Sequence, residues 1–146
     1  MLSRFDIEHL QFFYTDRDKV ELRKLFQAHM DNPNMKLYSA IYRGTVIAIL
    51  GVREVDRGVG TVWFTPCKDV WRYRIGLVKA CKWGIAHCLD LGFKRLQAVV
   101  RKDFDKGRNF LSYLGFKEEG LLEGYGTDGT AHYIFGRSEW QHLCCS

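Results

Sequence analysis

Residues 60–120 read GTVWFTPCKDVWRYRIGLVKACKWGIAHCLDLGFKRLQAVVRKDFDKGRNFLSYLGFKEEG and contain the pattern from which the rest of the chain can be placed. A run of β-branched and aromatic residues predicts a strand at 61–66, and a helical pattern follows at 74–91. Gly92 suits the end of that helix, and a second strand is predicted at 95–100. Two strands joined by a helical crossover are expected to run parallel.

The connection at 64–76 is where we expect a small-molecule site, because ligands of α/β sheets bind near the carboxyl ends of such strands. Other elements are placed by apolar spacing and turn residues. Before residue 60 we expect a strand within 5–13, a helix capped by Asp16 and ended by 32–34, and strands at 36–43 and 45–55 joined by Arg43-Gly44, followed by a turn at 56–58. After residue 100 we expect a helix at 106–114 capped by Asp105, and strands at 116–123 and 130–137 on either side of the turn 124–129. Alternation predicts that Leu37, Ser39 and Ile41 share one face. The predicted class is α/β with a mixed sheet, in which an antiparallel meander precedes a βαβ crossover and helices cover both faces.

Length and composition predict a single domain spanning residues 1–146. A chain of 146 residues, with 47% hydrophobic and 27% charged residues, can bury a core without disulfides or metals. No apolar run approaches the roughly 20 residues of a membrane-spanning helix, and the first residues lack a signal-peptide pattern. We therefore expect a cytoplasmic protein without a membrane partner.

The cysteines are interpreted as reduced thiols. An odd number, with neither a Cys-x-x-Cys motif nor a histidine at zinc spacing, favours neither a disulfide framework nor a metal site. The cysteines are Cys67, Cys81, Cys88, Cys144 and Cys145. Cys81 and Cys88 are expected to share the buried face of the long helix.

The formal net charge of +5 and the sequence pI of about 9.0 permit an anionic partner, such as a nucleotide-bearing cofactor or nucleic acid. The basic residues are spread along the chain and mixed with acidic ones. Because a solvated surface accounts for this distribution, nucleic acid is a partner that the sequence permits but does not favour.

The segment 109–120, NFLSYLGFKEEG, resembles the helix-then-LGF-x-x-x-G signature of the GNAT acyl-CoA N-acyltransferase superfamily. The segment 132–137, HYIFGR, resembles the closing strand of that family, and the order of the predicted elements is similar along the whole chain. The resemblance implies a GNAT-like fold, acetyl-CoA or another acyl-CoA as cofactor, and transfer of the acyl group to an amine by direct attack. The amine would belong to a small molecule or to a protein.

The family holds the cofactor pyrophosphate in an Arg/Gln-x-x-Gly-x-Gly/Ala loop at a helix N-terminus. The matching segment here begins at Arg72, and Ile75 and Leu77 stand where the family has small residues. Arg72 and Arg74 can attract phosphates by charge, whereas the glycine cradle is not evident. The cofactor-binding residues that the resemblance implies are Phe64, Thr65, Cys67, Arg72, Arg74, Ile75, Gly76 and Leu77. The strand that contains Phe64 is expected to pair with the pantetheine arm, and burial as plain core is the alternative interpretation of this side chain.

Two positions differ from those at which many members of the family carry functional side chains. Phe104 replaces an asparagine, and Leu111 replaces a tyrosine general acid. Tyr113, two residues further on, is the remaining candidate for the acid, at a different angle on its helix. Glu54 and Asp56, near the end of a hairpin strand, are the candidate bases, and surface carboxylates beside a turn are the alternative.

Tyr125, in the glycine-rich loop, and His132, on the last strand, are candidate substrate contacts. A turn residue and a structural histidine are the alternatives. The departures from the family pattern favour a second function, a non-catalytic binding or structural protein, because they resemble the degenerate GNAT-like proteins encoded by tailed bacteriophages. Such a protein would act in the host cytoplasm or in the virion. A third function, an acyltransferase acting on nucleic acid, is motivated by the net charge and the aromatic residues.

Overall fold

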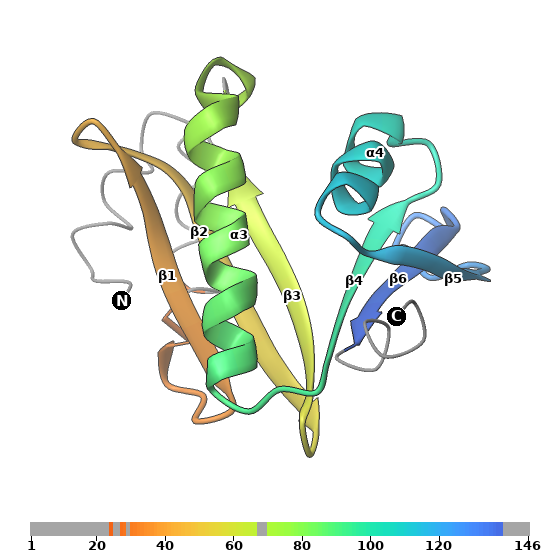
Figure 1. The fold of residues 1–146 in the computed structure, drawn as a ribbon. Helices are drawn as coiled ribbons and strands as arrows, with labels where there is room; N and C mark the ends of the chain where they lie inside the picture. The colour runs from red at the N-terminus through yellow and green to blue at the C-terminus, as the bar shows by residue number, and fades with distance from the viewer. Residues whose placement is uncertain (1–23, 25–26, 29, 67–69, 139–146) are drawn as a thin grey trace, which may run out of the picture. The chain divides into compact units, whose positions relative to one another are not determined.

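The computed structural model describes residues 24, 27–28, 30–66 and 70–138 (Figure 1). The predicted N-terminal strand, the helix start at Asp16, Cys67, Cys144 and Cys145 lie outside these residues. Within the described ranges no helix is long and apolar enough to cross a bilayer. In the same ranges no three His, Cys, Asp or Glu side chains gather at distances suited to a metal ion.

The described strands form one mixed sheet in the order β1-β2-β3-β4-β6-β5. The elements in chain order are β1 (Met35–Tyr42), β2 (Thr45–Asp56), β3 (Val59–Pro66), the 3₁₀ helix η2 (Val70–Tyr73), α3 (Arg74–Asp90), β4 (Arg95–Arg101), α4 (Asp105–Tyr113), β5 (Lys117–Leu122) and β6 (His132–Ser138). β3 and β4 are parallel, whereas β1 with β2, β4 with β6 and β5 with β6 are antiparallel. The predicted class and the parallel crossover are confirmed.

The described residues form two compact units. The first contains the residues up to Arg53 together with Trp63–Gly84, and the second contains Glu54–Val62 together with the residues from Ile85 onward.

The β1–β2 hairpin of the first unit turns at the predicted dipeptide, where Arg43 has φ 49° and Gly44 has φ 79°. The pairing shifts by one residue between Ala40 and Ile41, because Ala40 faces Ala48 whereas Ile41 faces Val46. This bulge reverses the alternation. Ala40 is therefore buried and Ile41 is 60% exposed, so the prediction that Ile41 shares a face with Leu37 is wrong.

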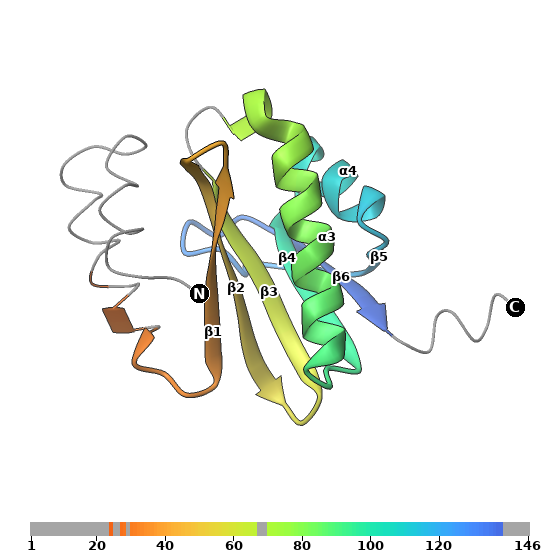
Figure 2. The same ribbon diagram turned by 60° about the vertical axis from the view of Figure 1, so that its left-hand side comes forward.

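Helix α3 lies along one face of the strands of the first unit (Figures 1 and 2). Its sheet-facing side chains are buried, and Leu77 and Cys81 are among them. Cys88, further along the same helix, is also buried, so the predicted core positions of both cysteines are confirmed. Burial raises the pKa of the Cys81 thiol from 9.0 to about 12, because the thiolate would lose its hydration.

The raised pKa predicts that Cys81 resists alkylation in the folded protein. Only the thiolate is an effective nucleophile, so we expect labelling by iodoacetamide at about pH 8 to be at least ~100-fold slower than in urea-unfolded protein. Mass spectrometry of chymotryptic peptides would follow Cys81 separately from the other cysteines. Equal labelling rates in the folded and unfolded states would contradict this prediction.

Helices α3 and α4 end in the motif that the glycines after them predict. Gly92, with φ 99°, follows α3, and the N–H of Phe93 donates to the carbonyl of Cys88 at 3.2 Å. Gly115, with φ 89°, follows α4, and the N–H of Phe116 donates to the carbonyl of Leu111 at 3.0 Å. These are Schellman caps, in which a left-handed residue allows the last carbonyls of the helix to find donors.

The second unit contains β4, β5, β6 and α4. β4 pairs with β3 at Val59–Thr61 and with β6 along its whole length. The predicted cap of α4 is wrong: Asp105 is the first helical residue, and the cap position is held by Phe104 without a side-chain hydrogen bond. Leu111 is 9% exposed and contributes to the core.

Candidate functional site

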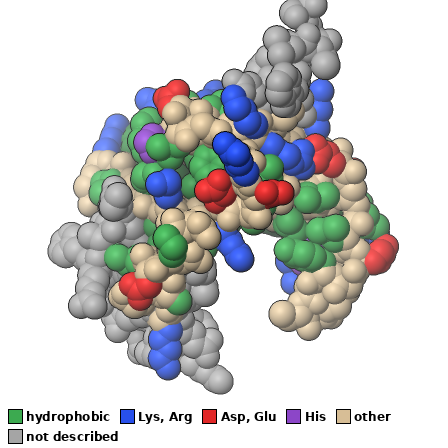
Figure 3. Space-filling view, turned by 90° about the horizontal axis from the view of Figure 1, so that it is seen from below, with side chains coloured by type: hydrophobic (Ala, Val, Ile, Leu, Met, Phe, Trp, Pro, Cys, Tyr) green, Lys and Arg blue, Asp and Glu red, His purple; other side chains and the backbone are tan. Residues whose placement is uncertain are grey.

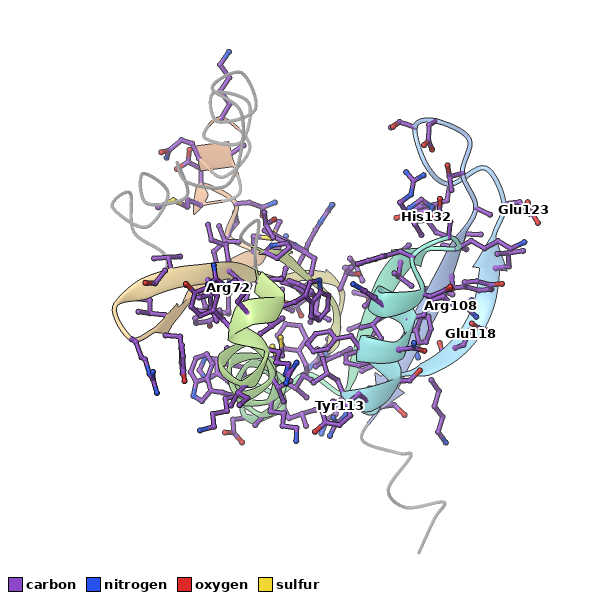
Figure 4. The ribbon with its side chains drawn as sticks, turned by 90° about the horizontal axis from the view of Figure 1, so that it is seen from above. Arg72, Arg108, Tyr113, Glu118, Glu123 and His132 are labelled. Carbon is purple, nitrogen blue, oxygen red and sulfur yellow. The ribbon has the colours of Figure 1, made fainter. Side chains whose placement is uncertain are left out.

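In the chain β3 is followed by the 3₁₀ helix η2 and then by α3, so the order of strand and long helix is as the sequence predicts. β3 ends at Pro66, which has no N–H to continue the pairing, and η2 then precedes α3. Val70 in η2 is buried, whereas Arg72 and Arg74 are exposed. Figure 4 shows Arg72 at this end of α3. Both guanidinium groups lie at the positive end of the helix dipole. Residues 70–89 contain no aspartate or glutamate, and Asp69 is the nearest carboxylate in the sequence.

Gly76 packs against Tyr42 of β1. A Cβ at Gly76 would lie 2.8 Å from Cδ2 and 2.9 Å from Cγ of Tyr42, which leaves no room for a side chain. The Tyr73 ring meets the same tyrosine edge-on, with 6.2 Å between ring centroids, and the guanidinium carbon of Arg43 lies 5.2 Å from its centroid. We call Arg43, Tyr42, Tyr73 and Gly76 the Tyr42 cluster. It brings the β1–β2 turn to the start of α3.

The residues at this helix N-terminus fit a phosphate group through charge. Arg72 and Arg74 supply guanidinium groups, which are suited to phosphate oxygens. Ile75 is 62% exposed and Leu77 is fully buried, so neither side chain adds a polar contact. Because Gly76 is covered by Tyr42, the close backbone approach of a glycine cradle is not formed by this residue.

The strand residues implied as cofactor contacts are half-buried: Phe64 and Thr65 both lie on β3. Neighbouring Trp63 lies over Gly51 of β2, where an added Cβ would be 2.9 Å from the indole Nε1 and closer still to two ring carbons. The indole ring of Trp63 therefore packs directly on the backbone of β2, which is possible because Gly51 has no side chain.

The two candidate catalytic residues lie on different elements. Glu54 is exposed on β2, and its Oε1 accepts a hydrogen bond from the N–H of Gly58 at 3.4 Å across the β2–β3 turn. This contact matches the alternative interpretation of Glu54 as a turn carboxylate. Tyr113 is 65% exposed at the last residue of α4 (Figure 4).

The two candidate substrate contacts are brought together at the β5–β6 loop. The rings of Tyr125 and His132 are tilted by 59°, with 5.1 Å between their centroids. Tyr125 is 59% exposed, whereas His132 is half-buried at the first residue of β6. Nδ1 of His132 lies 3.0 Å from the carbonyl oxygen of Thr130.

Arg101, Asp128 and Thr130 tie this loop to the end of β4, and we call them the loop clasp. Nη1 of Arg101 donates to Oδ2 of Asp128 at 3.1 Å, and Nη2 donates to Oγ1 of Thr130 at 3.2 Å. The backbone N–H of Thr130 donates to Oδ1 of Asp128 at 3.0 Å. The hydrogen bonds from Thr130, and then that from Arg101, hold the pKa of Asp128 well below its usual range.

The lowered pKa of Asp128 predicts an acid-resistant loop. A carboxylate whose pKa is lower in the folded than in the unfolded chain adds stability above the unfolded pKa, and this stability is lost as the pH falls through the folded pKa. The Thr130 amide should therefore keep its NMR shift at about pH 3.5, below the value of ~3.9 for an ordinary aspartate. A Thr130 shift that titrates near that ordinary value in the wild type would contradict the prediction, and Asp128→Asn provides the reference shift for a weakened clasp.

A further polar cluster connects α4, β5 and β6. Nη2 of Arg108 donates to Oε1 of Glu118 at 2.9 Å, and the guanidinium carbon lies 4.3 Å from the ring centroid of Tyr133. Nε of Arg108 is buried, with no hydrogen-bond partner among the described residues. Figure 4 shows Arg108 and Glu118 side by side. Sequence reasoning missed this cluster and the loop clasp, because both depend on contacts between distant parts of the chain. It predicted the turn at Arg43 but not the contact of this side chain with the Tyr42 ring.

The architecture described above is that of the GNAT-fold acetyltransferases, as solved structures show. One of them is a chimera of the spermidine N-acetyltransferase SpeG from Vibrio cholerae and hSSAT. The superposition covers 98% of this chain and 96% of the chimera, with a TM-score of 0.79 and 12% sequence identity. A second is RimJ from Mycobacterium smegmatis in complex with CoA-disulfide. The superposition covers 84% of this chain and 61% of RimJ, with a TM-score of 0.68 and 21% sequence identity. At these identities the likeness establishes the fold alone. No protein-family model matches the sequence, and no curated protein is similar enough in sequence to count as a relative.

Proposed function

We propose that this protein is an acyl-CoA-dependent N-acyltransferase that transfers an acetyl or other acyl group to an amine. The proposal depends on one observation: the N-terminus of α3, in a fold shared with acetyltransferases, presents two arginine side chains to solvent. There Arg72 and Arg74 are exposed at a helix N-terminus, and residues 70–89 contain no acidic residue. This arrangement suits the phosphates of a CoA-type cofactor. The neighbouring structures support the proposal, because spermidine N-acetyltransferase has the same fold and RimJ binds a CoA derivative.

Each candidate residue has a role in this proposal. Arg72 and Arg74 bind phosphate oxygens, and the backbone of β3 at Phe64–Thr65 pairs with the pantetheine arm. The cofactor supplies an acyl group activated as a thioester. In the net reaction the amine nitrogen forms a bond to the acyl carbon, the carbon–sulfur bond breaks, and the proton lost by the nitrogen balances the new thiol. Tyr113 is the side chain proposed to protonate the leaving sulfur, in the place of the buried Leu111.

Isothermal titration with acetyl-CoA tests the cofactor assignment. We expect saturable binding with a Kd in the range of about 1–100 µM, with CoA binding in the same range. Dephospho-CoA and acetyl-pantetheine are informative ligands, because only acetyl-pantetheine lacks the pyrophosphate that the arginines are proposed to hold. Absence of heat with acetyl-CoA up to about 1 mM would overturn the proposal.

A second candidate function is a non-catalytic binding protein on the same fold. It is favoured by Leu111, which is buried at the position of the family's acid, and by Gly76, whose open side is filled by Tyr42. Saturable binding of acetyl-CoA without acyl transfer to any amine would select this candidate. The alternative of an acyltransferase acting on nucleic acid gains no support from Figure 3. Among the described residues on the face it shows, Lys and Arg side chains are interspersed with Asp and Glu.

A further inference from the structure

Helix α3 has exposed apolar residues on the side that faces away from the strands. Ile75 is 62% exposed, Trp83 is 53% exposed, and Lys79 and Lys82 are exposed between them. Residues three and four positions apart lie on the same side of a helix, so these four side chains form one surface, which we call the α3 face. All four belong to the first unit, in which α3 covers one side of the strands (Figure 1).

The indole of Trp83 is held in one orientation although the residue is about half exposed. Its ring meets Tyr38 of β1 edge-on, with 5.6 Å between the centroids and 76° between the ring planes. A side chain that is already held loses little conformational freedom when a partner covers it. Tryptophan is also among the residues that contribute most to binding energy at protein interfaces. Trp83 therefore has the properties of a preformed anchor for another molecule.

Both charged groups of the α3 face are positive. Residues 70–89 contain no aspartate or glutamate, and Lys79 forms no ion pair with any described residue. The second unit differs, because Arg95, Arg101 and Arg108 each form an ion pair with a carboxylate. A positive surface with exposed apolar side chains is complementary to a segment that carries carboxylates beside apolar residues.

The spacing on the α3 face defines which segment would fit it. Ile75 and Trp83 are eight residues apart, which is about 12 Å along a helix, and Lys79 lies halfway between them. Side chains at i and i+4 of an extended chain, or at i and i+7 or i+8 of a helix, are about the same distance apart. The matching segment therefore has two apolar side chains at one of these spacings, with a carboxylate between them.

We propose that the α3 face docks an acidic segment of a partner protein, whose carboxylates pair with Lys79 and Lys82 and whose leucine or aromatic side chains cover Ile75 and Trp83. A second copy of this chain fits less well, because the net charge is +5 and a symmetric contact would place lysines against lysines. An anionic bilayer also fits less well, because membrane-surface helices keep apolar and basic residues on separate sides. The docking does not depend on the proposed acyltransferase function.

Selection from a displayed library of random peptides of about 12 residues tests the proposal without a known partner. The probe protein is the full chain, and Lys79→Glu combined with Lys82→Glu is used for counter-selection. We expect enriched peptides that carry aspartate or glutamate beside leucine, phenylalanine or tryptophan, and that bind with a Kd of about 1–100 µM. Charge reversal should weaken their binding at least ~10-fold, and added salt should weaken it in the wild type.

Lys106→Glu combined with Lys117→Glu is the matched control, because it makes the same change of charge at exposed positions of the second unit. We expect this variant to bind the peptides within about 3-fold of the wild type. The peptides should also shift the indole N–H signal in the NMR spectrum that is missing from Trp83→Phe. The Kd for acetyl-CoA should be unchanged by reversal of Lys79 and Lys82, so this test is separate from that of the proposed function.

Three results would overturn the proposal. The first is that no peptide is enriched, or that the enriched peptides bind equally well after reversal of Lys79 and Lys82. The second is a wild-type dimer in sedimentation velocity that the reversal separates, which would make a second copy the occupant. The third is binding to phosphatidylglycerol vesicles that depends on the two lysines while no peptide binds, which would make an anionic bilayer the occupant.

Discussion

Gly51→Ala is expected to destabilise the protein by about 2–3 kcal/mol, because an added methyl group would overlap the rigid indole of Trp63. The affected atoms include Nε1, 2.9 Å from the position that Cβ would take, and two ring carbons that are nearer. Gly51 is buried at the centre of β2, opposite Leu37 of β1, so a shift of the strand would disturb the hairpin as well. Urea unfolding followed by circular dichroism measures the change in the free energy of unfolding.

Gly84→Ala is the matched control within the same unit. A Cβ at Gly84 would meet Cδ1 of Leu50 at 3.8 Å, an ordinary van der Waals contact. Because alanine is favoured over glycine inside a helix by roughly 1 kcal/mol, this variant should be as stable as the wild type or more stable. If both alanine variants were as stable as the wild type, the packing of Trp63 on Gly51 would be contradicted.

The second large effect concerns affinity for acetyl-CoA. Arg72→Ala combined with Arg74→Ala should weaken binding by about 30-fold or more, since a hydrogen bond to a charged group contributes roughly 1.5–3 kcal/mol and exposure to solvent reduces this. Isothermal titration at low ionic strength gives the two dissociation constants. The difference should shrink as salt is added, because screening weakens the exposed charges.

Lys79→Ala combined with Lys82→Ala is the control for the arginine pair. It removes the same number of positive charges from exposed positions further along α3. We expect its Kd to stay within about 3-fold of the wild type, because the helix dipole and the phosphate contacts act within the first turn. Equal losses in the two double variants would mean that acetyl-CoA responds only to the overall charge of the protein.

Most of the fold could be predicted because local residues determine its turns. Arg43-Gly44, Gly92 and Gly115 adopt positive φ at the predicted ends of elements, and Pro66 ends β3. The bulge at Ala40–Ile41 could not be predicted, because alternation along one strand does not reveal which residue its partner strand skips.

The sequence predicts which segments contribute to the candidate site, but not which side chains contact one another there. Arg72 and Arg74 follow from their position at the start of the predicted long helix. Gly76 was expected to matter to a phosphate, whereas its contact with Tyr42 comes from a strand far earlier in the chain. The loop clasp likewise joins Arg101 to a residue 27 positions away, a distance over which no local pattern is informative.

Transfer of an acetyl group tests the proposed function most directly. The purified protein is incubated with ¹³C-acetyl-CoA and separate amines, including spermidine and a peptide with a free N-terminus, and each amine is examined by mass spectrometry. The account predicts a labelled amide on at least one amine, at a rate reduced in the Arg72/Arg74 double variant. No labelled amide on any amine, from protein that binds acetyl-CoA, would contradict the acyltransferase and leave the binding protein as the function.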